Sequence, residues 1–411
     1  MNVGGPAHHV SALNGLLDAD RYETLLVAGR LGRGEAPADE WARSRGATLQ
    51  SVEGLRPELR PGMHDAIALA RLAGVIRLFR PDIVHTHTAK AGFLGRLAAA
   101  YAVRPRPLIV HTYHGHVLEG YFNPTKNRVF GQLERLAGRM TDALLAVSHE
   151  TVDDLVRLGI APPSKFRTVS VGLDLGPFLR LQPKSGEAFR REVGVAPEEV
   201  LVTFVARLAP IKRADLALRA VANARRRGAP VRLAVVGDGL LRPDLERLAE
   251  ELGVADAVRF VGYRNDMPEI AAASDIALLT SDNEALGAAL VEAAAAGTPA
   301  VATAVGGVSE VVAAGCGLIV PAGDEDALAA ALVDLAEDPE VRGRMGAQAR
   351  EHVRERFSAR LLIAQMDDLY TELLARKAAS GGSSMPPLRE DGDALDEDLL
   401  AALPTRRSVR R

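Results

Sequence analysis

The sequence predicts an α/β protein made of two doubly wound domains that face a central cleft. From Thr24 onward, short apolar runs alternate with longer helical patterns, which is the signature of parallel α/β units. The alternation breaks at residues 172–187, which are rich in Gly, Pro and polar residues. A chain of 411 residues also has the length of two or three domains. We therefore place a linker at 173–190, between two Rossmann-like domains.

The first domain is predicted to span residues 1–172. Its helical patterns include His64–Arg80, which ends before Pro81, and Thr125–Arg139. Ser148 is expected to cap the helix that follows it. The predicted strands are Thr24–Ala28, Ala47–Ser51, Asp82–Thr86, Leu108–Thr112, Ala143–Val147 and Thr168–Val171.

The beginning of the first domain departs from the doubly wound pattern. The turn Gly4-Gly5-Pro6 precedes a helical pattern, Ala7–Leu17, and in such a sheet this turn follows the first, central strand. Only Met1, Asn2 and Val3 come before it. We expect the first strand to be missing and hypothesise that the natural start lies upstream. An in-frame stop codon immediately upstream in the genome would contradict this hypothesis.

The second domain is predicted to span residues 191–356. A helix at 357–376 is expected to return to the first domain, and the Gly-, Ser- and charge-rich residues 377–411 are expected to be a disordered tail. The predicted strands are Leu201–Ala206, Arg232–Val236, Val258–Val261, Ile276–Leu279, Ala300–Ala302 and Leu318–Val320.

The composition is that of an ordinary globular protein in a reducing compartment. Cys316 is the only cysteine, which excludes an intrachain disulfide and a thiolate metal cluster. No apolar run reaches the length of a membrane span, and the N-terminus lacks a signal-peptide pattern. The sequence therefore predicts a cytoplasmic protein, and we expect no nucleic acid as a partner.

The charge is distributed unevenly along the chain. Residues 1–180 hold 22 Lys and Arg against 17 Asp and Glu, whereas the remainder holds 28 against 36. Basic residues are densest in 90–139. This region is either a solvated basic face or a surface that attracts anionic lipid headgroups, which would make the protein peripheral on the inner face of the cell membrane.

Polar residues follow several predicted strands of the second domain, where ligands of such folds bind. Arg207 leaves one strand and Lys212 begins the next helix, so both cations can converge on one anion. The turn Gly237-Asp238-Gly239 follows the next strand and is a weak signal on its own. Gly262 and Tyr263 follow a third strand and can offer backbone groups to a nucleobase.

The stretch Ala273–Val312 contains two glutamates eight positions apart. We expect Glu284 at a helix entrance and Glu292 two turns inside, where they can contact opposite ends of one extended ligand. Small residues such as Gly287 let a ligand approach the helix N-terminus, whose amides favour negative or hydroxyl-rich groups. Glu292 can accept hydrogen bonds from vicinal hydroxyls, as on a ribose.

Five histidines follow two strands of the first domain. His85 and His87 follow one strand, and His111, His114 and His116 lie at the end of another. Without a carboxylate at fixed spacing, His-x-His pairs are a poor zinc site. We therefore expect no metal, and instead hydrogen bonds to a substrate hydroxyl.

In combination and in this order, these residues resemble the retaining glycosyltransferases of family 4, which have the glycosyltransferase-B fold. The likeness extends from Asn2 to about Tyr370. It implies that Arg207 and Lys212 bind the diphosphate of a sugar nucleotide and that Glu292 binds its ribose. The motifs are Gly4-Gly5, His114-Gly115, Arg207 with Lys212, Gly237-Asp238-Gly239, Glu284 with Glu292, Gly297-Thr298-Pro299 and Gly306-Gly307-Val308.

The resemblance also implies contacts with the transferred sugar. Glu284 would bind it with the amides of Leu286 and Gly287, and His114 would contact it from the opposite domain. Gly4 and Gly5 would let the backbone approach the phosphate or the acceptor. The motifs at 90–92 and 114–116 further resemble enzymes that build lipid-linked surface polysaccharides.

We therefore expect a retaining hexosyl- or N-acetylhexosaminyltransferase that needs no metal or other cofactor. Its donor would be a nucleoside-diphosphate sugar with UDP as the expected nucleotide, and its acceptor a glycan or lipid-linked hydroxyl. One alternative is a nucleotide-sugar epimerase or hydrolase, which would turn over without an acceptor. The other is a non-catalytic nucleotide-binding module, which would transfer nothing.

Overall fold

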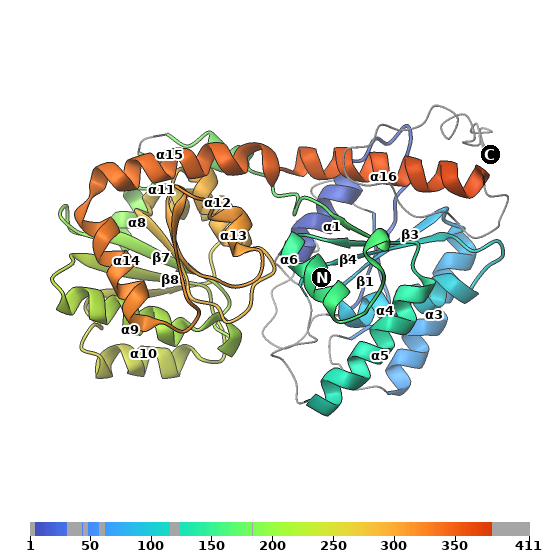
Figure 1. Ribbon diagram of the computed structural model, residues 1–411, viewed down its shortest axis with the longest axis horizontal. Coiled ribbons are helices and arrows are strands. Elements are labelled where there is room, and N and C mark those ends of the chain that lie inside the picture. The colour runs from blue at the N-terminus through green and yellow to red at the C-terminus, as the bar shows by residue number, and fades with distance from the viewer. Residues whose placement is uncertain are drawn as a thin grey trace. The chain divides into compact units, whose positions relative to one another are not determined.

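The computed structural model describes residues 5–30, 43, 48–56, 62–115, 124–182 and 184–379 (Figure 1). The chain forms two compact units. Unit 1 contains the described residues up to Gly172 and those from Arg360 onward, and unit 2 is Leu173–Ala359. The residues at either end of the chain, 1–4 and 380–411, lie outside the described part, and with them Gly4 and most of the predicted tail.

The strands of unit 1 form two parallel sheets. One pairs β1 with β2, and the other has the order β3-β4-β5-β6. Among the described residues no strand joins the two sheets. The last strand lies earlier than the predicted Thr168–Val171, because only Phe166–Thr168 pairs with β5. The strands are β1 (Leu26–Ala28), β2 (Leu49–Ser51), β3 (Ile83–His87), β4 (Leu108–Tyr113), β5 (Ala143–Ala146) and β6 (Phe166–Thr168).

The helices of unit 1 are α1 (Gly5–Leu16), α3 (Met63–Phe79), α4 (Ala89–Tyr101), α5 (Pro124–Met140), α6 (His149–Arg157), the short 3-10 helix η1 (Pro163–Lys165) and α16 (Ala359–Ala379). As predicted, Ser148 caps α6, since its hydroxyl accepts a hydrogen bond from the Thr151 amide.

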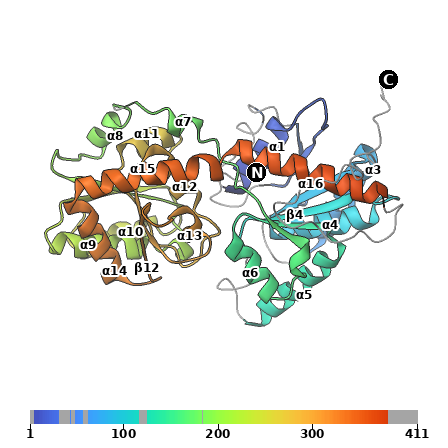
Figure 2. The ribbon, with the colours of Figure 1, turned by 45° about the horizontal axis from the view of Figure 1, so that its top comes forward.

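The C-terminal helix α16 packs on unit 1 beside α1 (Figures 1 and 2). Asp367 accepts hydrogen bonds from Tyr22, at 2.6 Å, and from Arg21, and Arg167 forms a 2.9 Å ion pair with the buried Glu372. The Tyr370 hydroxyl lies 2.6 Å from Nδ1 of His85. These polar contacts join α16 to the segment after α1, to β6 and to β3.

Unit 2 has a six-stranded parallel sheet in the order β12-β11-β10-β7-β8-β9. Its first strand, β7, therefore lies beside its fourth, β10, and the chain winds outward from this pair in both directions. In such a sheet the crevice between these two strands, at their carboxyl ends, is where ligands bind. The strands are β7 (Val200–Val205), β8 (Val231–Val236), β9 (Val258–Gly262), β10 (Ile276–Leu279), β11 (Ala300–Thr303) and β12 (Gly317–Val320).

Helices cover both faces of this sheet. Helices α9, α10 and α14 lie on one face, and α8, α11, α12 and α15 lie on the other (Figure 1). The stretch predicted as a linker contains α7 and the start of α8. The helices of unit 2 are α7 (Gly176–Leu179), α8 (Glu187–Glu192), the 3-10 helix η2 (Pro210–Lys212), α9 (Ala214–Arg226), α10 (Arg242–Glu251), α11 (Met267–Ala273), α12 (Ala288–Ala296), α13 (Val308–Val311), α14 (Glu325–Glu337) and α15 (Pro339–Arg356).

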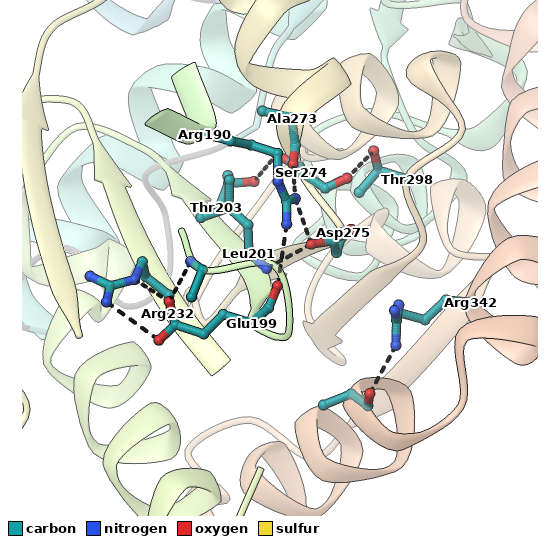
Figure 3. A network of polar contacts seen from close by, with 12 residues as sticks. Arg190, Glu199, Leu201, Thr203, Arg232, Ala273, Ser274, Asp275, Thr298 and Arg342 are labelled. Atoms are coloured by element: carbon teal, nitrogen blue, oxygen red, sulfur yellow. Dashed lines mark hydrogen bonds and ion pairs between the residues drawn. The ribbon is translucent and has the colours of Figure 1, made fainter. Parts of the chain in front are cut away.

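A polar network fixes β7 against β10 at their amino ends (Figure 3). Asp275, just before β10, accepts hydrogen bonds from the Leu201 amide on β7, at 2.7 Å, and from Arg190, at 2.8 Å. Arg190 also donates to the carbonyl of Ala273. Because this network lies at the far ends of the strands, it stabilises the pair without occupying the carboxyl-end crevice.

Candidate active site

The candidate site of unit 2 lies where β7 and β10 end side by side. Arg207 and Lys212 follow β7, and Glu284 follows β10. Lys212 donates a hydrogen bond from Nζ to Oε2 of Glu284, and the two side chains are 24 % and 15 % exposed. Two residues that the sequence assigned to different parts of one ligand are thus brought into direct contact, at the crevice where the fold binds ligands.

The loops that carry this ion pair are joined by backbone and hydroxyl contacts. The Thr280 hydroxyl donates to the carbonyls of Lys212, at 3.2 Å, and Arg213, at 2.8 Å. The Ser281 hydroxyl donates to Oε2 of Glu284 at 3.2 Å. The orientation of the lysine and the glutamate is therefore fixed by residues immediately after β10.

The motif Gly306-Gly307-Val308 requires glycine at its first position. It has φ +50°, and a Cβ there would overlap the carbonyl oxygen of Glu284. The neighbouring Gly307 donates its amide to the Ala285 carbonyl at 3.1 Å. The turn after β11 thus packs directly on the loop that bears Glu284, and only glycine fits there.

Arg207 is the second cation predicted at the diphosphate. Its side chain is exposed, and among the described residues it makes no hydrogen bond or ion pair. The turn Gly237-Asp238-Gly239 supports its loop, since the Leu208 amide donates to the Asp238 carbonyl at 2.9 Å. Gly237 has φ +128°, and a Cβ there would overlap the Ala206 carbonyl. The arginine therefore lies beside the crevice with its guanidinium available to a ligand.

The two residues predicted near a nucleobase lie at the end of β9. Gly262 has φ +73°, and its carbonyl accepts a hydrogen bond from the Gly237 amide at 2.8 Å. Tyr263, which follows, is 51 % exposed. Gly262 thus joins the end of β9 to the turn after β8, and Tyr263 presents an exposed ring at the same edge of the sheet.

Helix α12 begins later than the sequence suggested. Gly287 has φ +85° and is the N-cap of α12, so the helix begins after it and Glu284 lies in the preceding loop. Leu286 in this loop is buried. Glu292 is the fifth residue of the helix, little more than one turn inside rather than two. The prediction of its depth was wrong because the left-handed glycine delays the helix start. The helix amides still lie between the two carboxylates.

Glu292 is partly buried, and burial raises its pKa from 4.5 to about 7. Among the described residues it makes no hydrogen bond or ion pair. Near neutral pH the group is therefore close to half protonated. A ligand that donates hydrogen bonds to the carboxylate would stabilise its charged form and lower this pKa.

We predict that Glu292→Gln makes unit 2 more stable at pH 8. A carboxyl whose folded-state pKa is raised keeps a proton that the unfolded chain has released, so its contribution to stability falls as pH rises from 4.5 to about 7. The difference in the free energy of unfolding between Glu292→Gln and wild type should be at most about 3 kcal/mol at pH 8 and should vanish near pH 4. Thermal unfolding across this range measures it, with the exposed Glu337→Gln as the control. Parallel pH profiles for wild type and both variants would contradict the raised pKa.

The candidate residues of unit 1 surround the end of β4. His114 has Nε2 3.1 Å from Nδ1 of His87, and burial holds the pKa of both rings well below 6.5. At neutral pH His114 is thus a neutral hydrogen-bonding group and not a cation. Gly5 starts α1 and a Cβ there would meet no atom within 4 Å, so packing among the described residues does not demand glycine. Gly4 and His116 lie outside the described residues.

Sequence reasoning missed three participants of these two clusters. Thr280 and Ser281 were not singled out, although polar residues directly after β10 are a signal for side chains that fix the following loop. His9 on α1 was not considered with the other histidines, yet its ring lies 4.9 Å from that of His114. No local pattern could identify His9, because the contact depends on where α1 packs.

Two family models cover most of the chain. Residues 3–176 match "Glycosyltransferase Family 4", and residues 185–352 match "Glycosyl transferases group 1". The boundary between the matches falls close to the boundary between the two units.

Relatives with established names agree with these matches. A D-inositol 3-phosphate glycosyltransferase of Saccharomonospora viridis is 36 % identical over 313 residues, covering 72 % of this chain and 70 % of the relative. An N-acetyl-alpha-D-glucosaminyl L-malate synthase of Bacillus anthracis is 28 % identical over 313 residues, covering 76 % and 80 %.

Solved structures share the fold. HepE of Anabaena, in complex with UDP and glucose, has a TM-score of 0.74 at 22 % identity, covering 89 % of this chain and 95 % of that one. WaaG, a glycosyltransferase involved in lipopolysaccharide biosynthesis, has a TM-score of 0.67 at 21 % identity, covering 89 % and 94 %. The family matches, the relatives and the shared fold confirm the resemblance seen in the sequence, and the chain belongs to the family 4 glycosyltransferases of the glycosyltransferase-B fold.

Proposed function

We propose that the protein transfers a hexosyl or N-acetylhexosaminyl group from a UDP-sugar to an acceptor hydroxyl, with retention of anomeric configuration. The observation on which this proposal rests is the Lys212–Glu284 ion pair at the β7/β10 crevice. Arg207 lies beside it, and its side chain has no hydrogen-bond or ion-pair partner within the part of the chain that the structure describes. A lysine and an arginine at one strand edge match a diphosphate, and a fixed carboxylate matches sugar hydroxyls. The choice of donor is supported by HepE, which shares the fold and binds UDP and glucose.

The chemical step would use the diphosphate as both leaving group and base. The bond from the anomeric carbon to the phosphate oxygen breaks, and the acceptor oxygen attacks on the same face. The acceptor proton passes to the phosphate oxygen that leaves. Lys212 and Arg207 would stabilise the negative charge that develops on this oxygen, and preorganised charges of this kind are a main source of catalysis.

The other residues would position the donor. Glu284 and the amides of Leu286 and Gly287 would bind the sugar hydroxyls, and Glu292 would accept hydrogen bonds from the ribose. His114, neutral at pH 7, would donate or accept a hydrogen bond at the transferred sugar. We propose that donor activation needs no metal, because the two cations and the α12 N-terminus together offset the diphosphate charge.

Two acceptor classes have support. The names of the relatives favour a small anionic hydroxyl compound, such as an inositol phosphate or malate. Helix α5 favours a lipid-linked acceptor held at an anionic membrane, because Val129, Leu133 and Leu136 are exposed on the helix that also carries Lys126, Arg128 and Arg139. Among the described helices, none combines the length and the hydropathy of a membrane span. Co-sedimentation with phosphatidylglycerol vesicles, which a phosphatidylcholine control should not reproduce, tests the second class.

The experiment that tests this function has two stages. A thermal-shift screen of sugar nucleotides identifies the donor, since a bound ligand raises the unfolding temperature by mass action. That donor is then incubated with inositol phosphate, malate or lipid extract, and the anomeric configuration of the product is read by NMR. We expect acceptor-dependent transfer with retention; an inverted product would contradict the proposed step.

The same experiment separates the two alternatives. Acceptor-independent turnover of the donor would indicate an epimerase or a hydrolase. Tight UDP binding without turnover in any condition would indicate a binding module.

A further inference from the structure

Three histidines from three different elements of unit 1 converge in space. They are His9 on α1, His87 at the end of β3 and His114 after β4, and one ring nitrogen from each lies within 4.8 Å of the others. The ring centroids of His9 lie 5.4 Å from His87 and 4.9 Å from His114, and those of His87 and His114 are 5.3 Å apart. Neither the family resemblance nor the proposed transfer step uses this cluster as a unit.

The hydrogen bond of His9 determines which of its nitrogens can bind a ligand. Its Nδ1 lies 3.2 Å from the Val171 carbonyl, which can only accept, so Nδ1 carries the ring proton. Nε2 must then present a lone pair. This atom is completely buried, and among the described residues it has no hydrogen-bond partner. A metal-ligating histidine usually donates the N–H of one ring nitrogen to a carbonyl or carboxylate and offers the lone pair of the other nitrogen to the metal.

The other two histidines offer suitable geometry. Nδ1 of His87 and Nε2 of His114 are 3.1 Å apart. Two nitrogens bound to Zn²⁺ at 2.0–2.1 Å in a tetrahedral site would be about 3.3 Å apart, so a small adjustment replaces their mutual hydrogen bond with two metal bonds. Both side chains are partly exposed, which gives an ion a path to the cluster.

We propose that His9, His87 and His114 form a three-histidine site for a divalent transition metal, best suited to Zn²⁺, with a fourth coordination position open to water or another ligand. Imidazole nitrogens favour zinc, copper and nickel over magnesium and calcium. The site differs from one in which a sugar-nucleotide diphosphate recruits a metal, because its ligands belong to unit 1 alone. One consequence rests on the proposed function: a metal on His114 and a sugar on His114 exclude each other, so Zn²⁺ would inhibit transfer.

Direct metal titration tests the site. Full-length protein without a polyhistidine tag is treated with a chelator and titrated with CoCl₂, then with ZnCl₂. We expect one Co²⁺ per chain, with the intense visible absorption of four-coordinate cobalt, and its displacement by Zn²⁺. Removing a residue that only hydrogen-bonds to a metal ligand weakens metal binding about 10–100-fold, so removing a ligand itself, in His9→Gln or His87→Gln, should weaken Co²⁺ binding at least that much.

A matched control lies in the same cluster. His85 is next to His87, with ring centroids 4.3 Å apart, but Nδ1 is bonded to Tyr370 at 2.6 Å and Nε2 to Thr112 at 2.7 Å. His85→Gln should therefore bind Co²⁺ much as wild type does, because both ring nitrogens of His85 already have partners and neither is offered to the ion. No four-coordinate cobalt spectrum, or equal binding by wild type and His87→Gln, would overturn the proposal.

A second readout keeps the test valid if a variant folds poorly. Zn²⁺ should raise the unfolding temperature of wild type and of His85→Gln but not of His87→Gln, since only a site that binds the folded state stabilises it. If Zn²⁺ binds as expected but does not inhibit transfer, the sugar role of His114 is wrong while the metal site stands.

Discussion

Lys212→Ala should lower the turnover of sugar transfer by about 10²–10³-fold, which is the scale for removing one preorganised charge from a transition state. The Lys212 ammonium is fixed by Glu284 at the carboxyl ends of β7 and β10. Because its charge would oppose the charge developing on the leaving diphosphate, its loss should act on turnover more than on donor affinity. Initial rates with the donor and acceptor identified in the screen measure the effect.

Two controls separate this role from a structural one. Lys184→Ala removes an exposed lysine of the same unit and should leave turnover unchanged. The double variant Lys212→Ala/Glu284→Gln removes the carboxylate that the first change leaves without its partner. If activity returned in the double variant, or if Lys212→Ala stayed within a few-fold of wild type, the diphosphate assignment would be wrong.

Glu134→Ala should strongly destabilise unit 1. Arg96 is completely buried, and its Nη2 donates to both carboxylate oxygens of Glu134, at 3.0 and 2.8 Å. The Tyr113 hydroxyl donates to the same carboxylate at 2.8 Å, and burial raises the pKa of this tyrosine. Removing Glu134 leaves a buried guanidinium without its counter-charge, which costs about 3–5 kcal/mol.

The loss of stability should be measured at β4 itself, because Tyr113 is the last residue of this strand and His114 follows it. Hydrogen exchange of peptides from β4 should become at least about 100-fold faster in Glu134→Ala. The control is Glu53→Ala, which breaks an exposed 2.7 Å ion pair with Arg71 and should change stability by less than about 0.5 kcal/mol. Equal exchange in both variants would mean that Arg96 finds another partner.

The sequence was sufficient to predict the strands of unit 2. Each is a short aliphatic run between a helix and a polar turn, and β10 begins and ends at the predicted residues, Ile276 and Leu279. The sequence also placed Arg207 and Lys212 at one strand end. Periodicity and turn residues are local signals, and local signals determine these features.

Other features depend on packing that no local pattern reports. The contact of Lys212 with Glu284 exists because β10 pairs with β7 and not with β9, the strand that precedes β10 in the sequence. The late start of α12 follows from the left-handed conformation of Gly287. The sequence alone does not report this conformation, because a glycine is equally compatible with a turn and with a helix cap. Likewise, His9 meets His87 and His114 only through the packing of α1.

The central claim is that Lys212 contacts the phosphates of a nucleoside diphosphate, and calorimetry of UDP and uridine with wild type and Lys212→Ala tests it most directly. A charge-assisted hydrogen bond contributes about 1.5–3 kcal/mol. UDP should therefore bind wild type at least about 10-fold more tightly than uridine does, and this ratio should fall by about 10-fold or more in Lys212→Ala, with uridine affinity unchanged. The same ratio in both proteins would contradict the account.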